Sequence, residues 1–183
     1  MSHWNAAGVP DATMGKLAGI GIVPAIMVAL VALLAFLPCI NPLRKNYAAF
    51  RNWYDGFILV FVFFMLAIQS QIILRSLGYH ISMNLLMPVL VGLLFIYTGF
   101  FLERVEPNRS AGIRTPWTLS SATVWKKTHM PGGKLFKIAG IVSCAGALMP
   151  DFAIWFILVP ALVTALVTVV CSWYAFQKEK EKS

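Results

Sequence analysis

Five apolar runs dominate this sequence and restrict what it can fold into. They span about Leu17 to Leu37, Tyr54 to Leu74, Leu85 to Leu102, Leu135 to Met149 and Phe152 to Phe176. A helix needs roughly 20 apolar residues to cross about 30 Å of hydrocarbon, so runs of this length predict membrane spans. The fourth run is short and ends at Pro150-Asp151, so we expect a thin or tilted span, or one paired with the fifth run as a hairpin.

The runs predict helices rather than strands. Hydrocarbon offers no hydrogen-bond partner for a backbone amide, and the runs lack the apolar and polar alternation of a barrel wall. With 59% apolar and 12% charged residues among 183, the chain is also too apolar for a water-soluble domain of this length. The predicted fold is therefore all-α, a polytopic transmembrane helical bundle of about five spans.

Basic residues predict how the bundle is oriented. Thirteen of the 15 lie in three places that five spans would bring to one side of the membrane. Lys and Arg near span ends are retained in the cytoplasm, so we expect the N-terminus outside and the C-terminus inside. The thirteen are Arg44, Lys45 and Arg51 after the first run, Arg104, Arg109, Arg114, Lys126, Lys127, Lys134 and Lys137 between the third and fourth, and Lys178, Lys180 and Lys182 after the fifth.

The sequence gives little support for an enzyme, a metal site or a nucleic-acid partner. The net charge of +8 sits at span ends, where basic residues face anionic lipid headgroups. The predicted topology places His3 and His80 outside and His129 inside, so the three cannot share one metal ion. The chain has no HExxH, GxSxG or Walker-type motif, and we expect no catalytic residue and no cofactor. The cysteines are scattered and lack metal or redox spacing: Cys39, Cys144 and Cys171.

The segment from Asn108 to Phe136 is the longest one without apolar character. Pro107 and Pro116 disfavour helix in its first half. Leu119-Ser120-Ser121 places a Ser at the N-cap of a short helix that we expect to run from about Ser121 to His129 and to end at Pro131-Gly132-Gly133. Its Trp and Lys residues are typical of a helix lying at the bilayer surface. Two interpretations stay open, an interfacial connector and a functional loop, and long ordered loops are more often functional.

The string GIRTPWTLSSATVWKKTHMPGGKLF in this segment resembles the signature of the SdpI family of bacterial integral membrane proteins. Three parts carry the resemblance: Gly112 to Leu119, Val124 to His129 and Gly132 to Phe136. HWNAAGVPD, His3 to Asp11, resembles a motif of the small domain of unknown function that commonly precedes the SdpI domain, and Ile40 to Phe50 resembles the linker that follows it. We expect residues 1–50 to be part of that domain and residues 51–183 to form the SdpI-like membrane domain.

The resemblance implies a role in immunity or sensing at the bacterial inner membrane. The member that gives the family its name protects the producing cell from a secreted, membrane-active killing peptide and acts as a receptor that holds a transcriptional repressor at the membrane. A transmembrane helix normally precedes the His-Trp-Asn motif, whereas Met1 lies two residues ahead of His3, so this member either lacks that span or begins further upstream.

The leading hypothesis divides the candidate residues between the two faces of the membrane. Externally, the segments His3 to Asp11 and Gly78 to Met83 would meet a peptide toxin or envelope ligand. In the cytoplasm, the loop would dock a regulator or lipid headgroups. The external motif residues are His3, Trp4, Asn5 and Gly8. The loop residues are Gly112, Arg114, Thr115, Pro116, Trp117, Trp125, Lys126, Lys127, His129, Gly132 and Gly133.

Two alternatives remain. An accessory subunit of a larger membrane complex is suggested by the small residues of the fourth run, such as Gly140 and Cys144, which let another helix approach closely. A small transporter is less favoured because it needs ionisable groups at mid-span, whereas Asp55 and Arg75 lie near the ends of the second run.

Overall fold

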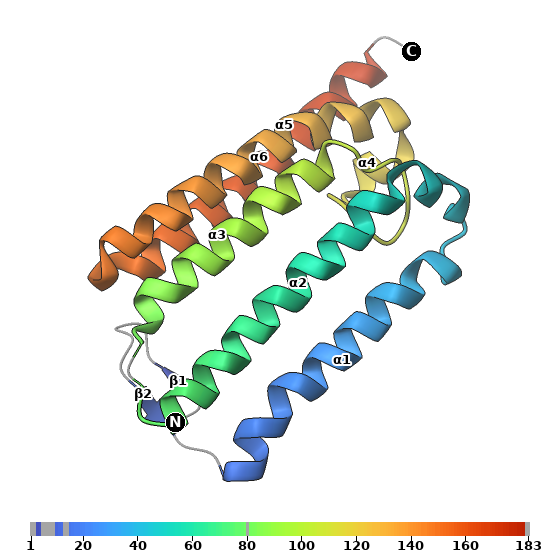
Figure 1. Cartoon of the computed structure of the whole chain (residues 1–183). Helices are drawn as coiled ribbons and strands as arrows, with labels where there is room; N and C mark the ends of the chain where they lie inside the picture. The colour runs from blue at the N-terminus through green and yellow to red at the C-terminus, as the bar shows by residue number, and fades with distance from the viewer. Residues whose placement is uncertain (1–2, 5–9, 13–14, 80, 182–183) are drawn as a thin grey trace.

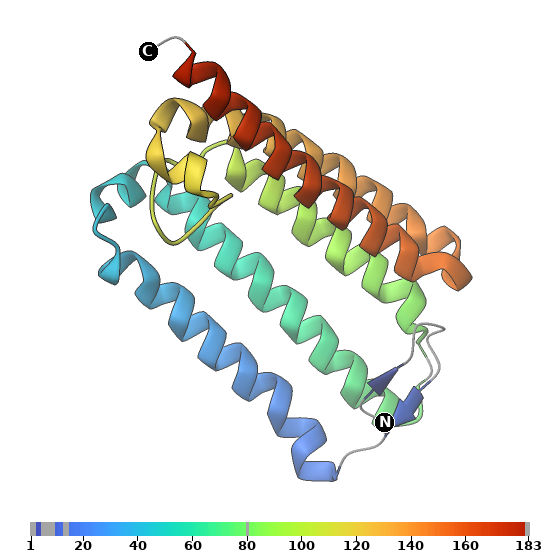
Figure 2. The same cartoon turned by 180° about the vertical axis from the view of Figure 1, so that it is seen from behind.

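Five long helices run side by side in alternating directions and form a helical bundle (Figure 1, Figure 2). The computed structural model describes residues 3–4, 10–12, 15–79 and 81–181. The predicted all-α class is confirmed within these residues. The helices are α1 (Lys16–Ile40), α2 (Tyr47–Ser76), α3 (Met83–Leu102), α5 (Ala122–Ala145) and α6 (Ala153–Lys180).

Short elements connect the long helices at both ends of the bundle. Two strands, β1 (His3–Trp4) and β2 (Pro10–Ala12), pair antiparallel before α1. The helix α4 (Pro116–Ser120) lies in the loop between α3 and α5. The remaining turns are the 3₁₀ helices η1 (Arg44–Asn46), η2 (Gly146–Leu148) and η3 (Pro150–Phe152).

Four of the five predicted spans are long and apolar enough to cross a membrane. In the described part of the chain these are Leu17–Ile40, Tyr47–Ser76, Met83–Leu102 and Pro150–Lys180. The run from Leu135 to Met149 does not meet this measure, because it fills only the second half of α5 and the first half carries Lys residues and other polar groups. α5 packs against both α3 and α6, and α1 lies at the opposite side of the bundle against α2 (Figure 1).

Glycines bring α3 and α5 into backbone contact. A Cβ added at Gly92 would lie 2.6 Å from the carbonyl oxygen of Gly140, and one added at Gly99 would lie 2.5 Å from that of Gly133. The two glycines of α3 are seven residues apart, as are the two of α5, so each pair lies on one face of its own helix. The missing side chains allow the close packing by which membrane helices associate. The predicted small-residue face of the fourth run is thus used within the chain.

The prediction that a short helix ends at Pro131-Gly132-Gly133 was wrong. Of the two candidate serines, Ser121 is the N-cap, and its Oγ accepts hydrogen bonds from the backbone amides of Thr123 and Val124 at 3.2 and 3.3 Å. The helix then runs without interruption to Ala145. Gly132 and Gly133 are buried, so tight packing offsets the cost of about 1 kcal/mol that each glycine adds inside a helix. The separate short helix of this loop is instead α4.

Hydrogen bonds tie the three basic regions to one end of the bundle. Asn41 Nδ2 donates to Ser110 Oγ at 2.7 Å and Asn46 Nδ2 to the carbonyl of Pro107 at 2.6 Å, joining the α1–α2 turn to the α3–α5 loop. Ser121 Oγ donates to Glu179 Oε1 at 2.9 Å, joining that loop to the C-terminal end of α6. The regions counted as one side in the sequence are therefore neighbours in space.

Candidate functional site

The loop after α3 is folded by the side chain of Asn108. Its Oδ1 accepts hydrogen bonds from the backbone amides of Ser110 and Ala111 at 2.8 and 2.7 Å. Its Nδ2 donates to the carbonyls of Glu106 and Ala111 at 2.9 and 3.0 Å. Asn108 is 1% exposed, so one buried amide replaces the backbone pairing that a helix or strand would supply. Its place directly after Pro107 is a turn signal, but the sequence does not show that its side chain is buried and holds the loop together.

Gly112 brings the loop backbone against α5. It has a φ of +104°, a conformation that side-chain-bearing L residues rarely adopt. A Cβ there would lie 2.6 Å from Nε2 of His129 and 3.3 Å from the ring of Trp125. Gly112 is therefore required both for its conformation and for the space that it leaves to the two rings.

His129 binds the loop through one ring nitrogen and its own helix through the other. The backbone amide of Ile113 donates to Nε2 at 2.9 Å, so Nε2 is an acceptor and Nδ1 carries the proton. Nδ1 in turn donates to the carbonyl of Trp125 at 2.9 Å. Burial lowers the pKa of His129 from 6.5 to about 4, against the opposing effect of that hydrogen bond. At neutral pH the ring is uncharged, as its two bonds require.

Trp125 joins the loop to the aromatic core. It is 2% exposed, stacks on His129 with ring centroids 4.0 Å apart, and donates from Nε1 to the carbonyl of Val105 at 2.9 Å. The core around it contains Tyr47, Phe50, Tyr54, Phe101, Leu102 and Val105. This places Trp125 inside the protein, so its expected role as an anchor in the headgroup belt is wrong.

The Thr-Pro-Trp-Thr string starts α4 with a reciprocal cap. The backbone amide of Thr118 donates to Oγ1 of Thr115 at 3.2 Å, and the amide of Thr115 donates to Oγ1 of Thr118 at 2.9 Å. Pro116 occupies the first helical position, where its missing N–H costs nothing. Oγ1 of Thr118 also donates to the carbonyl of Ile113 at 2.8 Å, so the helix start is fixed to the Gly112 turn.

Comparison with known proteins finds two matches. The model of the SdpI/YfhL protein family matches residues 104–174, from the start of the loop to near the end of α6. Immunity protein SdpI of Bacillus subtilis (strain 168) is 28% identical over 171 residues, which cover 92% of this chain and 80% of that protein. The chain is similar to SdpI proteins along most of its length. No solved structure shows a significant match to it.

The SdpI-like signature divides into a buried and an exposed set. The packed residues come from the loop and from the first half of α5: Gly112, Thr115, Trp125, His129, Gly132 and Gly133. Arg114, Pro116, Lys126 and Lys127 are exposed, and Trp117 is half-buried. The structure therefore brings the predicted residues together, but it makes about half of them a scaffold and leaves three cations on the surface.

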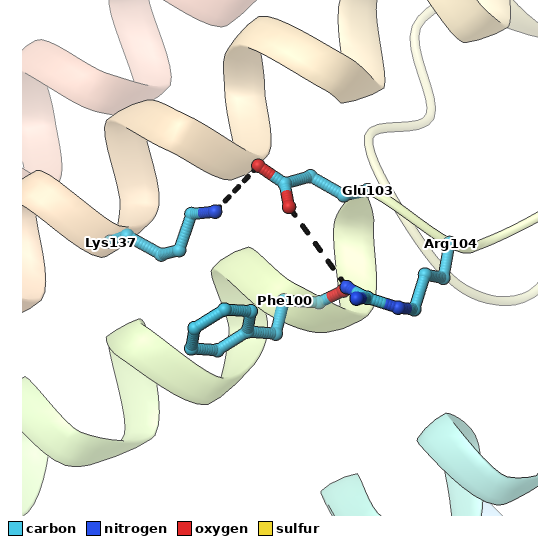
Figure 3. A network of polar contacts seen from close by, with 4 residues as sticks. All are labelled: Phe100, Glu103, Arg104 and Lys137. Carbon is cyan, nitrogen blue, oxygen red and sulfur yellow. Dashed lines mark hydrogen bonds and ion pairs between the residues drawn. The ribbon is translucent and has the colours of Figure 1, made fainter.

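An ion-pair network at the end of α3 was not predicted as a site. Glu103 lies between two cations, with Lys137 Nζ 2.6 Å from its Oε1 and Arg104 Nη1 3.9 Å from its Oε2 (Figure 3). Arg104 also donates to the carbonyl of Phe100 at 3.1 Å and lies 3.9 Å over the ring of Trp53. The sequence offers a faint signal, an acidic residue among many basic ones, but the partner of Glu103 lies 34 residues away.

The predicted external motif lies apart from the loop. His3 and Trp4 form β1, which pairs with β2 near the α2–α3 turn, at the end of the bundle opposite α4 (Figure 1). Asn5 and Gly8 fall outside the described residues, so their expected part in this motif stays a prediction. Among the residues that the structure describes, no three His, Cys, Asp or Glu side chains lie close enough to hold a metal ion.

Proposed function

We propose that this chain is a non-enzymatic immunity protein of the bacterial inner membrane that protects against membrane-active peptides. Its similarity to an immunity protein over 92% of its length is the observation that carries this proposal. The external segments meet the peptide, and the exposed part of the signature loop docks a cytoplasmic partner.

Orientation follows from the charge at the two ends of the bundle. Of the 14 basic residues that the structure describes, twelve lie at the end that holds the α1–α2 turn, the signature loop and the last turns of α6. The positive-inside rule assigns this end to the cytoplasm and the N-terminus to the outside. The loop is then available to cytoplasmic proteins and to the anionic headgroups of the inner leaflet.

The exposed cations of the signature suit an acidic partner surface. Arg114 lies two residues after the Gly112 turn, and Lys126 and Lys127 lie on the first turns of α5. The turn and the helix are joined by the Ile113–His129 hydrogen bond, so the three cations are presented on a rigid support. Fixed cations lose less side-chain and loop entropy on binding than cations on a mobile loop.

His129 and Asp55 have structural partners. Both nitrogens of His129 are engaged by backbone groups. Asp55 accepts from Arg51 Nε at 3.2 Å in an exposed pair one helical turn apart. These contacts favour a binding role over catalysis or proton transport.

The proposal is tested by survival of a sensitive bacterium that expresses the chain during challenge with a panel of membrane-active peptides. Expression is expected to raise survival against at least one peptide. The combined variant Arg114→Ala, Lys126→Ala, Lys127→Ala tests the docking face, with Lys178→Ala, an exposed cation outside the signature, as the control. Membrane levels are measured for each variant, since only variants inserted at wild-type levels are compared.

The outcomes separate protection from docking. Survival that is unchanged by expression, for every peptide in the panel, overturns the immunity proposal. If the triple variant protects as well as the wild type but no longer retains a cytoplasmic partner on purification, protection and docking are separate activities of the two faces. If it both protects and retains the same partners, the cations do not form a docking face.

The accessory-subunit alternative loses the support that it drew from the small-residue face. The small-residue face that suggested it is occupied by α3, through the contact of Gly140 with Gly92. Purification in mild detergent still distinguishes the two proposals, because a subunit would be recovered at constant stoichiometry with a larger complex.

A further inference from the structure

A groove of about 410 Å³ opens between α2 and α3. Its walls are apolar side chains of the two helices: Val60, Phe63, Phe64, Leu90, Leu93, Ile96, Tyr97 and Phe100. The one hydroxyl among them, that of Tyr97, is taken up in a 3.2 Å hydrogen bond to the carbonyl of Trp53. With its polar atom engaged, the groove suits a hydrocarbon chain and offers nothing to a polar ligand.

A cation lies where the groove reaches the end of α3. Arg104 follows Phe100 by four residues and therefore shares its face of the helix. The guanidinium lies 3.9 Å over the ring of Trp53, which belongs to α2 and precedes Val60 by seven residues. The same two helix faces thus carry hydrocarbon along the groove and an aromatic-supported positive charge at its end.

The charge of Arg104 is only partly neutralised. Glu103 makes its short contact, 2.6 Å, with Lys137, and its other oxygen is 3.9 Å from Arg104. Two cations share one carboxylate in Figure 3, which leaves this cluster with one net positive charge. The Arg104 side chain remains 42% exposed, so it is open to an anion from the surrounding membrane.

The length of the groove matches one leaflet. The groove residues of α3 extend from Leu90 to Phe100, ten residues that rise about 15 Å along a helix. This is close to half of the roughly 30 Å hydrocarbon thickness of a bilayer. A lipid whose headgroup lies at Arg104 therefore has its acyl chain beside the groove over the depth of its own leaflet.

We propose that this groove is a binding site for an anionic phospholipid. One acyl chain fills the space between α2 and α3, and the lipid phosphate pairs with Arg104 beside the Trp53 ring. An anionic headgroup is favoured over a zwitterionic one because the cluster has a net positive charge and no free carboxylate. The site is independent of the signature loop and of any peptide ligand.

The test measures quenching of Trp53 fluorescence by lipids brominated near the headgroup end of the chain. The full chain is reconstituted in phosphatidylcholine vesicles that contain increasing fractions of brominated phosphatidylglycerol or brominated phosphatidylcholine. Subtracting the signal of Trp53→Phe isolates the contribution of Trp53. We expect about fivefold tighter association of phosphatidylglycerol, which corresponds to the ~1 kcal/mol that one cation contributes with an anionic headgroup.

Three variants give the result its meaning. Arg104→Gln should remove the preference for phosphatidylglycerol while quenching by both lipids persists. Val60→Phe, which fills the groove, should weaken quenching by both lipids. Arg109→Gln removes an exposed cation from the following loop and should leave the preference unchanged.

The proposal fails if the wild-type protein shows equal quenching by the two lipids, a result that needs no variant to fold. It also fails if Arg109→Gln lowers the preference as much as Arg104→Gln, because general surface charge would then be the cause. Loss of quenching in Val60→Phe without any effect of Arg104→Gln would reduce the groove to an ordinary lipid-facing surface.

Discussion

Replacing Gly112 with alanine should destabilise the protein by an amount that the structure allows to be divided into two parts. The first part is conformational, because a side-chain-bearing residue at a φ of +104° is strained by roughly 1–2 kcal/mol. The second part is local. The new Cβ would lie 2.6 Å from Nε2 of His129, so the ring must move away from the amide of Ile113.

The second part is the larger test of the structure. Moving His129 leaves a buried backbone donor without its acceptor, which costs about 1–3 kcal/mol. Gly78 is a matched control because its φ is +96° and a Cβ there meets nothing within 4 Å. Gly78→Ala should therefore show only the conformational cost, and the two variants should differ by about 1–3 kcal/mol.

Thermal denaturation of purified protein in mild detergent, followed by tryptophan fluorescence, measures this difference. At about 2–4 °C per kcal/mol for a chain of this size, Gly112→Ala should melt about 2–12 °C below Gly78→Ala. Equal melting temperatures for the two variants would refute the argument that the Gly112 turn is pressed against His129. A low melting temperature for Gly78→Ala alone would show that the opposite turn, not the signature loop, is the sensitive one.

Two further predictions concern the same scaffold. The lowered pKa of His129 means that the unfolded chain binds more protons than the folded one between about pH 4 and 6.5. The free energy of unfolding should therefore be at its full value above pH 6.5 and fall toward pH 4 with a slope approaching ~1.4 kcal/mol per pH unit. Melting temperatures of the wild type across this range should show the fall, and His129→Gln should flatten it. Gly140→Ala should lower the melting temperature because its Cβ would lie 2.5 Å from the carbonyl oxygen of Gly92. Gly19→Ala is the control: a Cβ there meets nothing within 4 Å, so the melting temperature should stay the same or rise slightly. Equal melting temperatures for the two variants would show that α3 and α5 are not in backbone contact.

The start of α5 could be predicted from the sequence, but its continuation could not. Ser121 caps the helix through its own hydroxyl, a local interaction that needs no tertiary contact. Pro131, Gly132 and Gly133 lower local helix propensity, and the sequence alone therefore predicted an end. Packing of the two glycines against Ile113 and Gly99 overrides that preference, because membrane helices gain most from close backbone approach.

The signature loop shows the same division. Composition and resemblance marked the loop as a candidate functional segment, since charged, aromatic and glycine residues interrupt the apolar runs there. Which residues face inward was not evident. In the sequence, Trp125 and His129 resemble surface anchors because they are next to Lys126 and Lys127. In the structure their rings pack against the Gly112 turn and are almost fully buried. Contact between residues 16 apart depends on how the loop returns to α5, and no local rule fixes that path.

The sequence by itself determined that the chain lies in a lipid bilayer, that it is helical and that its basic regions share one side. Each of these depends on quantities that add along the chain: the length of apolar runs, backbone hydrogen bonding in hydrocarbon, and the number of cations per loop. Tertiary structure alone decided that Glu103 pairs with Lys137 and that Arg104 lies over the ring of Trp53. It also decided that about half of the signature residues are packed inside the protein while the others are exposed. These outcomes depend on which helices become neighbours, and that choice is made by packing between residues far apart in the chain.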